Sequence, residues 1–311
     1  MKKNKLSVIL PYFLFFGKRI DQILSHFFQE YSRSFLKKCI LNNQVLVNGK
    51  IENHPDKKMI GGEKIVVLLF NIEPMIDIPE NIFLDIVYED EDILVINKPA
   101  GLVVHPGAGN RNGTLLNALL YRYITIHNLP RAGIVHRLDK DTSGLMVIAK
   151  TIISYTYLFN LLKNRKIIRK YQAIVQGSMI SGGIIDAPIM RHHIKRTCMM
   201  VNDLGKKSVT HYKIIKKFSL YTHISVQLET GRTHQIRVHM LHIGYPIVGD
   251  SVYNRNFHHP ITNIKQKNQK IFFPRQALHA YHLSFCHPIT KKKMKWIISL
   301  PKDMITLLKI L

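Results

Sequence analysis

The sequence is poor in cysteine and has no long apolar segment. Its three cysteines, Cys39, Cys198 and Cys286, lie far apart and match no metal-binding or redox spacing. We therefore expect reduced thiols and a cytoplasmic location. No apolar stretch is long enough to cross a bilayer. Residues 2–16 imitate a signal peptide, but Pro11 interrupts the apolar run and no small-residue cleavage site follows, so we predict a first β-strand there.

Acidic residues are scarce as well. Asp and Glu number 20 against 45 Lys and Arg, which gives a formal net charge of +25. A field of this sign attracts polyanions and favours a nucleic-acid partner. An AT-rich genome also enriches a sequence in Lys, so the charge supports such a partner without identifying it. With 311 residues, 46% of them hydrophobic, the chain can form one large domain and a small one.

Motifs for cofactors and metals are missing from the sequence too. It contains neither a P-loop nor a dinucleotide fingerprint. The cation-rich segment 188–199 includes His192 and His193, but no carboxylate or cysteine stands at ligand spacing, so we predict a loop that contacts phosphate. His234 and His239 lack the Glu of a metallohydrolase motif, which favours ordinary surface and core histidines. We predict no metal and no cofactor.

Periodic apolar residues predict two helices and a hairpin in the first part of the chain. Residues 20–27 and 35–40 have helical spacing, with Ser32 as the N-cap of the second helix. Asn48-Gly49 between apolar runs predicts a hairpin turn, and residues 61–67 predict another strand.

The later part of the chain alternates between strand and helix patterns. Proline-containing residues 71–81 separate it from the first part, and we place the linker at residues 76–83. The segment 254–274 is polar and basic, and we expect a mobile loop. The remaining patterns predict two strands at 86–96, strands at 145–149, 170–175, 223–229 and around Trp296, and helices at 114–123, 151–163, from Gly231 onward and at the C-terminal end.

Two motifs carry chemistry. In the first, His136-Arg137-Leu138-Asp139 is followed by a turn and by the apolar run 145–149, which predicts a buried strand. A rigid loop of this kind suits a catalytic carboxylate that substrate must reach, although a solvated turn is the commoner outcome of such charges. The second motif, 230–240, begins a helix that has Arg237 near its start.

These motifs, with 97–107 and 276–280, resemble those of the RluA-type pseudouridine synthases over nearly the whole chain. The resemblance implies an α+β pseudouridine synthase fold in residues 84–311, with a large mixed, mainly antiparallel bent sheet flanked by helices. It also implies a small S4-like (alpha-L) RNA-binding domain in residues 18–75, preceded by an N-terminal strand or extension at 1–17. The implied activity converts uridine to pseudouridine, an isomerisation that needs no cofactor.

The resemblance also assigns residue roles. Asp139 is the implied catalytic carboxylate, Arg237 its basic partner, and Tyr171 lies against the target base, although a strand tyrosine more often serves packing. Attack on the sugar, attack on the ring and deprotonation of the sugar are all open roles for Asp139. Arg137 resembles the residue that fills the stack left by an everted uridine. The other expected RNA contacts are Arg33, Lys37, Lys38, Lys50, Arg232 and His234, with Lys98 and His105 along the RNA path.

Two strings, 85–92 and 102–109, are most similar to family members that act on large-subunit ribosomal RNA. They imply a 23S rRNA or pre-ribosomal substrate, modified in the helix 69 stem-loop at the subunit interface, and we expect a monomer. A sibling synthase with other 23S targets is an alternative. A non-catalytic RNA-binding assembly factor is another, against which the intact Asp139, Tyr171 and Arg237 argue. A metal-dependent nuclease is the third alternative, and it predicts strand cleavage that a chelator abolishes.

Overall fold

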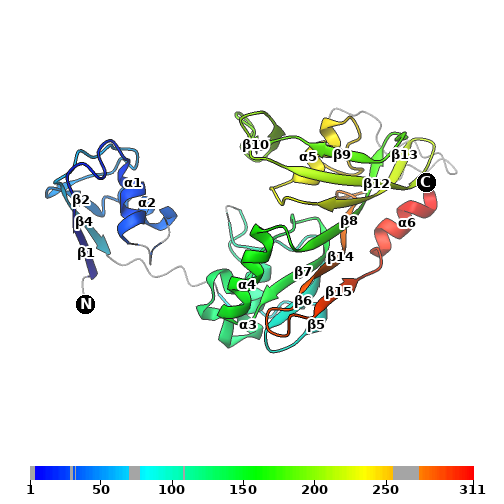
Figure 1. Ribbon diagram of the computed structural model, residues 1–311, viewed down its shortest axis with the longest axis horizontal. Coiled ribbons are helices and arrows are strands. Elements are labelled where there is room, and N and C mark those ends of the chain that lie inside the picture. Colours follow the sequence, from blue (N-terminus) through cyan, green and yellow to red (C-terminus); the bar gives the residue numbers. More distant parts are fainter. Residues whose placement is uncertain (1–3, 29–30, 32, 70–77, 108, 255–272) are drawn as a thin grey trace. The chain divides into compact units, whose positions relative to one another are not determined.

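The computed structural model describes residues 4–28, 31, 33–69, 78–107, 109–254 and 273–311. The chain divides into two compact units, residues 1–76 and 77–311, each with its own core (Figure 1). The predicted N-cap Ser32 and most of the segments 71–81 and 254–274 lie outside the described residues. Among the described residues, no helix combines the length and the apolar character that crossing a membrane requires.

The first unit packs two helices against a small antiparallel sheet. Asn48 and Gly49 form the predicted hairpin turn and have φ angles of 49° and 81°. Because β1 pairs with β4 along its whole length, the N-terminal strand belongs to the sheet of this unit. The sheet order is β1-β4-β2-β3, and the elements are β1 (Asn4–Ile9), α1 (Ile20–Phe27), α2 (Arg33–Leu41), β2 (Val45–Val47), β3 (Lys50–Ile51) and β4 (Lys64–Leu69).

The second unit is built on a nine-stranded mixed sheet with the order β5-β6-β7-β14-β8-β13-β12-β9, and β15 pairs with β14. All pairs are antiparallel except β7 with β14. A register shift between His279 and His282 marks a bulge in the β8–β14 ladder, and bulges bend sheets. The predicted α+β class, with a large mixed and mainly antiparallel sheet, is confirmed. The strands are β5 (Ile86–Glu89), β6 (Ile93–Lys98), β7 (Ser143–Ala149), β8 (Ile168–Gln176), β9 (Gly183–Asp186), β12 (Val209–Lys217), β13 (Tyr221–Leu228), β14 (Leu278–Cys286) and β15 (Lys293–Ile297).

Helices cover both halves of this sheet. Figure 1 shows α3 (Leu115–Arg122) and α4 (Ile152–Lys163) beside the β5–β7 half, and α5 (Gln235–His242) beside β9 and β12. Thr114 begins α3 with a capping box, as its place before the apolar run suggests. A last helix, α6 (Lys302–Ile310), ends the chain.

The cation-rich segment 188–199 differs from its prediction as a plain loop. Residues Ile189–Arg191 and Met199–Val201 pair as strands β10 and β11 of a separate two-stranded sheet. His192, His193 and Lys195 lie in the connection between these strands. The two strands were missed because each has three residues, which is too short a run for a periodic pattern to show.

Candidate active site

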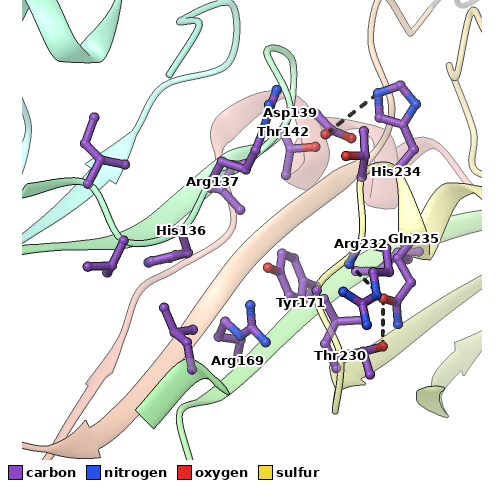
Figure 2. A pocket seen from close by; sticks show the side chains of 18 of the residues that line it. His136, Arg137, Asp139, Thr142, Arg169, Tyr171, Thr230, Arg232, His234 and Gln235 are labelled. Carbon is purple, nitrogen blue, oxygen red and sulfur yellow. Dashed lines mark hydrogen bonds and ion pairs between the residues drawn. The ribbon is translucent and has the colours of Figure 1, made fainter. Parts of the chain in front are cut away.

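A cleft of about 930 Å³ opens in the second unit where three segments meet. They are the loop before β7, the start of β8, and the connection from β13 into α5. Figure 2 shows Asp139 and Arg137 on one wall, His234 and Arg232 on the other, and Tyr171 with Arg169 between them. The two sequence motifs, which are about 90 residues apart, are thereby brought face to face.

Asp139 and Arg237 form an ion pair at the wall of the cleft. The Arg237 Nη1 atom donates to Asp139 Oδ2 at 3.1 Å, as the sequence analysis predicted. The same guanidinium makes a two-point contact with Asp250, through Nε at 2.6 Å and Nη2 at 2.8 Å. Burial opposes the charge on Arg237, but the bonds and charge of Asp250, followed by those of Asp139, outweigh burial and raise the pKa of Arg237.

The loop carrying Asp139 is anchored by side chains from two other motifs. Lys98 in β6 donates to the carbonyls of Pro99, Leu102 and Lys140, the last of which directly follows Asp139. Arg275 and Gln276, from the string before β14, donate to Asp141 O and to Thr142 Oγ1. Such support fixes the carboxylate before any substrate arrives.

The structure corrects the expected place of Lys98. Its side chain is 0% exposed, so it does not line an RNA path. Burial lowers the pKa of Lys98 to about 7. The protonated form has three N–H donors, and three carbonyls accept them. Lys98 therefore acts as an internal brace for the loop that carries Asp139. His105 does line the cleft, as expected.

Replacing Lys98 by Met should lower the unfolding free energy of the second unit by about 2 kcal/mol, because three carbonyls lose a buried donor while the cost of burying the charge disappears. Trp296 is the single tryptophan of the chain and lies in β15, so its fluorescence during urea denaturation reports on this unit. Lys140→Met, which changes an exposed side chain and keeps its carbonyl, is the control. Equal stability of K98M and K140M would contradict the brace.

Tyr171 and Arg169 form the floor of the cleft. Both belong to β8, two residues apart, and therefore face the same side of the strand. The Tyr171 side chain is 5% exposed, and burial raises its pKa, so the phenol stays protonated at neutral pH. Arg169 presents a cation beside the phenol, and its Nε atom is buried with no acceptor among the described residues.

Two histidines near Asp139 are neutral at neutral pH, the half-buried His136 of the same loop and the buried His279 of β14. His136 Nε2 accepts the Val147 amide at 3.0 Å, and burial, followed by the charge of Arg169, lowers the pKa of His136 to about 3. His279 is 1% exposed, and its Nδ1 lies 2.8 Å from Ser143 Oγ. Burial, followed by the charge of Arg275, lowers the pKa of His279 to about 4.

The pKa of His279 predicts acid destabilisation of the second unit. An unfolded histidine takes up its proton near pH 6.5, whereas folded His279 does so only near pH 4. The free energy of unfolding therefore decreases as the pH is lowered from 6.5 to 4. The expected contribution is about 1.4 kcal/mol per pH unit for this one group. Urea denaturation followed by Trp296 fluorescence at several pH values measures it. His279→Gln should flatten the dependence by this amount, and an unchanged slope would contradict the assignment.

The remaining predicted RNA contacts are divided between the two units. Arg137, Arg232 and His234 all line the cleft. In the first unit, Lys37, Lys38 and Lys50 are exposed. The fourth residue predicted there, Arg33, donates to Asp21 Oδ2 through Nε at 3.1 Å and Nη2 at 2.7 Å.

The sequence analysis missed three residues of the site. Arg169 could have been found from its spacing of two before Tyr171 in a predicted strand. Asp250 and Tyr253 follow α5 in a turn, and no pattern links this turn to the motif at Asp139. Asp250 is recognised from the structure alone, since the bond between it and Arg237 depends on how the chain folds back.

Comparisons with known proteins agree with this geometry. Residues 92–242 match the family described as RNA pseudouridylate synthase. Ribosomal large subunit pseudouridine synthase D of Buchnera aphidicola subsp. Schizaphis graminum is 60% identical over 98% of this chain and 97% of its own length. The protein of the same name from Escherichia coli K12 is 50% identical over 95% and 91%.

A solved structure, Human RNA Pseudouridylate Synthase Domain Containing 4, has a similar fold. It matches with a TM-score of 0.55 and 25% identity over 73% of this chain and 92% of its own. The two sequence motifs, the sheet and the identity to these relatives lead to one conclusion. This chain belongs to the RluA-type family of RNA pseudouridine synthases.

Proposed function

We propose that the protein converts uridine to pseudouridine in large-subunit ribosomal RNA. The observation that carries the proposal is the Asp139 carboxylate, 17% exposed and bonded by a buried guanidinium, at the wall of a cleft that suits one nucleotide. The names of the relatives support the RNA target, because both are called ribosomal large subunit pseudouridine synthases. The net charge of +25 favours the same polyanionic partner.

The reaction breaks the bond between C1′ of the ribose and N1 of uracil and joins C1′ to C5. N1 gains a proton in place of the ribose and C5 gives up the proton that it carried, so atoms and electrons balance without a cofactor. Arg237 stabilises the ionised form of Asp139, because a hydrogen bond to a charged group favours the charged state. Asp139 Oδ1, which Arg237 does not bind, is the oxygen available to the nucleotide as nucleophile or base.

Other cleft residues receive and hold the target. A uridine must leave its stack to reach the cleft, and the exposed guanidinium of Arg137 can stack on a neighbouring base while bonding phosphate. Tyr171 offers a largely buried aromatic ring against the uracil, and its phenol hydroxyl keeps its proton. Arg232 adds a cation at the opposite wall.

We further propose a monomer that works in the cytoplasm on the helix 69 stem-loop. The support for a monomer is that the catalytic pair and the cleft come from one chain. The first unit serves as an S4-like RNA-binding module, for which its order of two helices and a hairpin, with Lys37, Lys38 and Lys50 exposed, is the support.

Mapping of pseudouridine in ribosomal RNA from cells with and without the gene tests the function. We expect large-subunit positions to lose the modification, small-subunit positions to stay unchanged, and purified protein to restore it on unmodified RNA. Binding without product would instead support an assembly factor, and chelator-sensitive strand cleavage would support a nuclease. Product at other large-subunit positions would reject the helix 69 assignment and support a sibling synthase.

A further inference from the structure

Tyr253 packs against Arg237 and links the start of β11 to the residue that precedes α5. Its hydroxyl oxygen accepts the Met199 amide at 2.8 Å. The same oxygen lies 2.8 Å from Nδ1 of His234, the residue that directly precedes α5. A phenol has one proton and two lone pairs, so both contacts are satisfied when the hydroxyl donates to His234 Nδ1.

This arrangement selects one tautomer of His234. Burial lowers the pKa of His234, with Asp139 as the strongest opposing charge, so the imidazole is neutral at neutral pH. Burial likewise raises the pKa of Tyr253 to about 12, which keeps its proton in place. In a neutral imidazole one nitrogen accepts and the other donates. If Nδ1 accepts from Tyr253, the proton of the ring is on Nε2.

His234 Nε2 points toward the free oxygen of the catalytic carboxylate. It lies 3.8 Å from Asp139 Oδ1 (Figure 2). This separation is about 1 Å longer than a hydrogen bond, and catalytic hydrogen bonds are often long before substrate binds. Arg237 binds the other oxygen, Oδ2. The two oxygens of Asp139 therefore face two different donors.

We propose that Tyr253 fixes His234 as the Nε2–H tautomer and that this N–H positions Asp139 Oδ1 for reaction. The inference rests on the proposed function, because it assigns a task within the same site. Tyr253 and His234 are positioning residues in this scheme, and Asp139 remains the group that meets the nucleotide.

The contacts around Tyr253 and His234 hold these two side chains in place. Asp250 Oδ1 accepts the amides of Val252 and Tyr253 at 3.0 and 3.1 Å, so the carboxylate that orients Arg237 also fixes the turn of Tyr253. The Arg237 guanidinium lies 5.0 Å from the centre of the Tyr253 ring. His234 itself has a φ of 55°, a left-handed conformation that costs a non-glycine residue free energy and that often occurs at functional sites.

A double-mutant cycle tests the coupling. Tyr253→Phe removes the hydroxyl and should lower kcat about tenfold with KM unchanged, since proton placement and not binding is lost. His234→Gln places an amide N–H near the Nε2 position and has no tautomers, so Y253F should cause no further loss in the H234Q background. His234→Asn tolerates the left-handed backbone but is too short to reach, and it should lose activity like Y253F.

Tyr221→Phe is the matched control, because it removes a buried phenol hydroxyl of the same unit outside the cleft lining. It should keep the wild-type kcat. Wild-type kcat in Y253F would overturn the proposal, and so would an equal loss from Y253F in the wild-type and H234Q backgrounds.

A spectroscopic readout separates this inference from the proposed function. In protein labelled with ¹⁵N-histidine, the Nδ1 of His234 should resonate as an unprotonated nitrogen and its Nε2 as a protonated one, and Y253F should mix the two tautomers. A protonated Nδ1 in the wild-type protein would overturn the proposal even if pseudouridine forms. A wild-type protein that forms none would refute the function, while the tautomer measurement stands on its own.

Discussion

Replacing Asp139 by Asn should abolish pseudouridine formation while RNA binding stays close to that of the wild type. Asparagine keeps the size of the side chain and an oxygen for Arg237, but it can act neither as a nucleophile nor as a base. We expect a loss of at least ~10³-fold in the single-turnover rate, about 4 kcal/mol of transition-state stabilisation. Removing a negative charge from a basic protein does not weaken its attraction for phosphate.

The measurement compares product formation with the RNA dissociation constant at one fixed salt concentration. Asp139→Ala should show the same loss, and because alanine cannot deamidate to aspartate, it excludes a trace of restored enzyme. Asp186→Asn, at the exposed end of β9, is the control with the same change outside the cleft, and it should keep full activity. Product formation by D139A at the wild-type rate would refute both the residue assignment and the proposed chemistry.

Periodicity predicted most of the helices and strands, and its failures have physical causes. The helices α1 and α2 and the hairpin at Asn48-Gly49 lie where the pattern placed them. Strand β12 was missed because Lys213, Lys216 and Lys217 occupy its half-exposed end, and a basic, solvated strand gives no clear alternation of apolar and polar residues. Sheet order is also beyond periodicity, because the pairing of β7 with β14 joins residues more than 130 positions apart.

The site residues that could be predicted are those that belong to a short sequence motif. Asp139 and Arg237 were paired in advance because each belongs to a motif that resembles a family, and the 3.1 Å contact confirms that they meet. The supporting residues could not be predicted in this way. Lys98 appeared to be a surface cation, yet it is fully buried, since burial of a lysine depends on carbonyls supplied by three other residues.

Replacing Asp250 by Asn should destabilise the second unit by about 3 kcal/mol and also remove activity. The Asp250 side chain is 0% exposed and binds Arg237, itself 6% exposed, through two hydrogen bonds. Asparagine keeps an oxygen for the amides of Val252 and Tyr253 but cancels the charge. Removal of one partner from a buried ion pair leaves the other uncompensated, which typically costs 3–5 kcal/mol. Asp139, at 3.1 Å, is then the carboxylate that still pairs with Arg237. Without Asp250 the guanidinium is no longer held in its orientation, so the position of the Asp139 carboxylate changes and activity is lost.

Asp303→Asn provides the matched control. Asp303 also binds an arginine at two points, Arg275 at 2.7 and 3.0 Å, but its own side chain is 40% exposed. Solvent screens that pair, so the loss should be no more than about 1 kcal/mol. Urea denaturation followed by Trp296 fluorescence compares the two variants, and pseudouridine formation is measured on the folded protein. Equal losses of stability in D250N and D303N would show that Arg237 does not need Asp250 to stay buried, and the ordered site would then need another support.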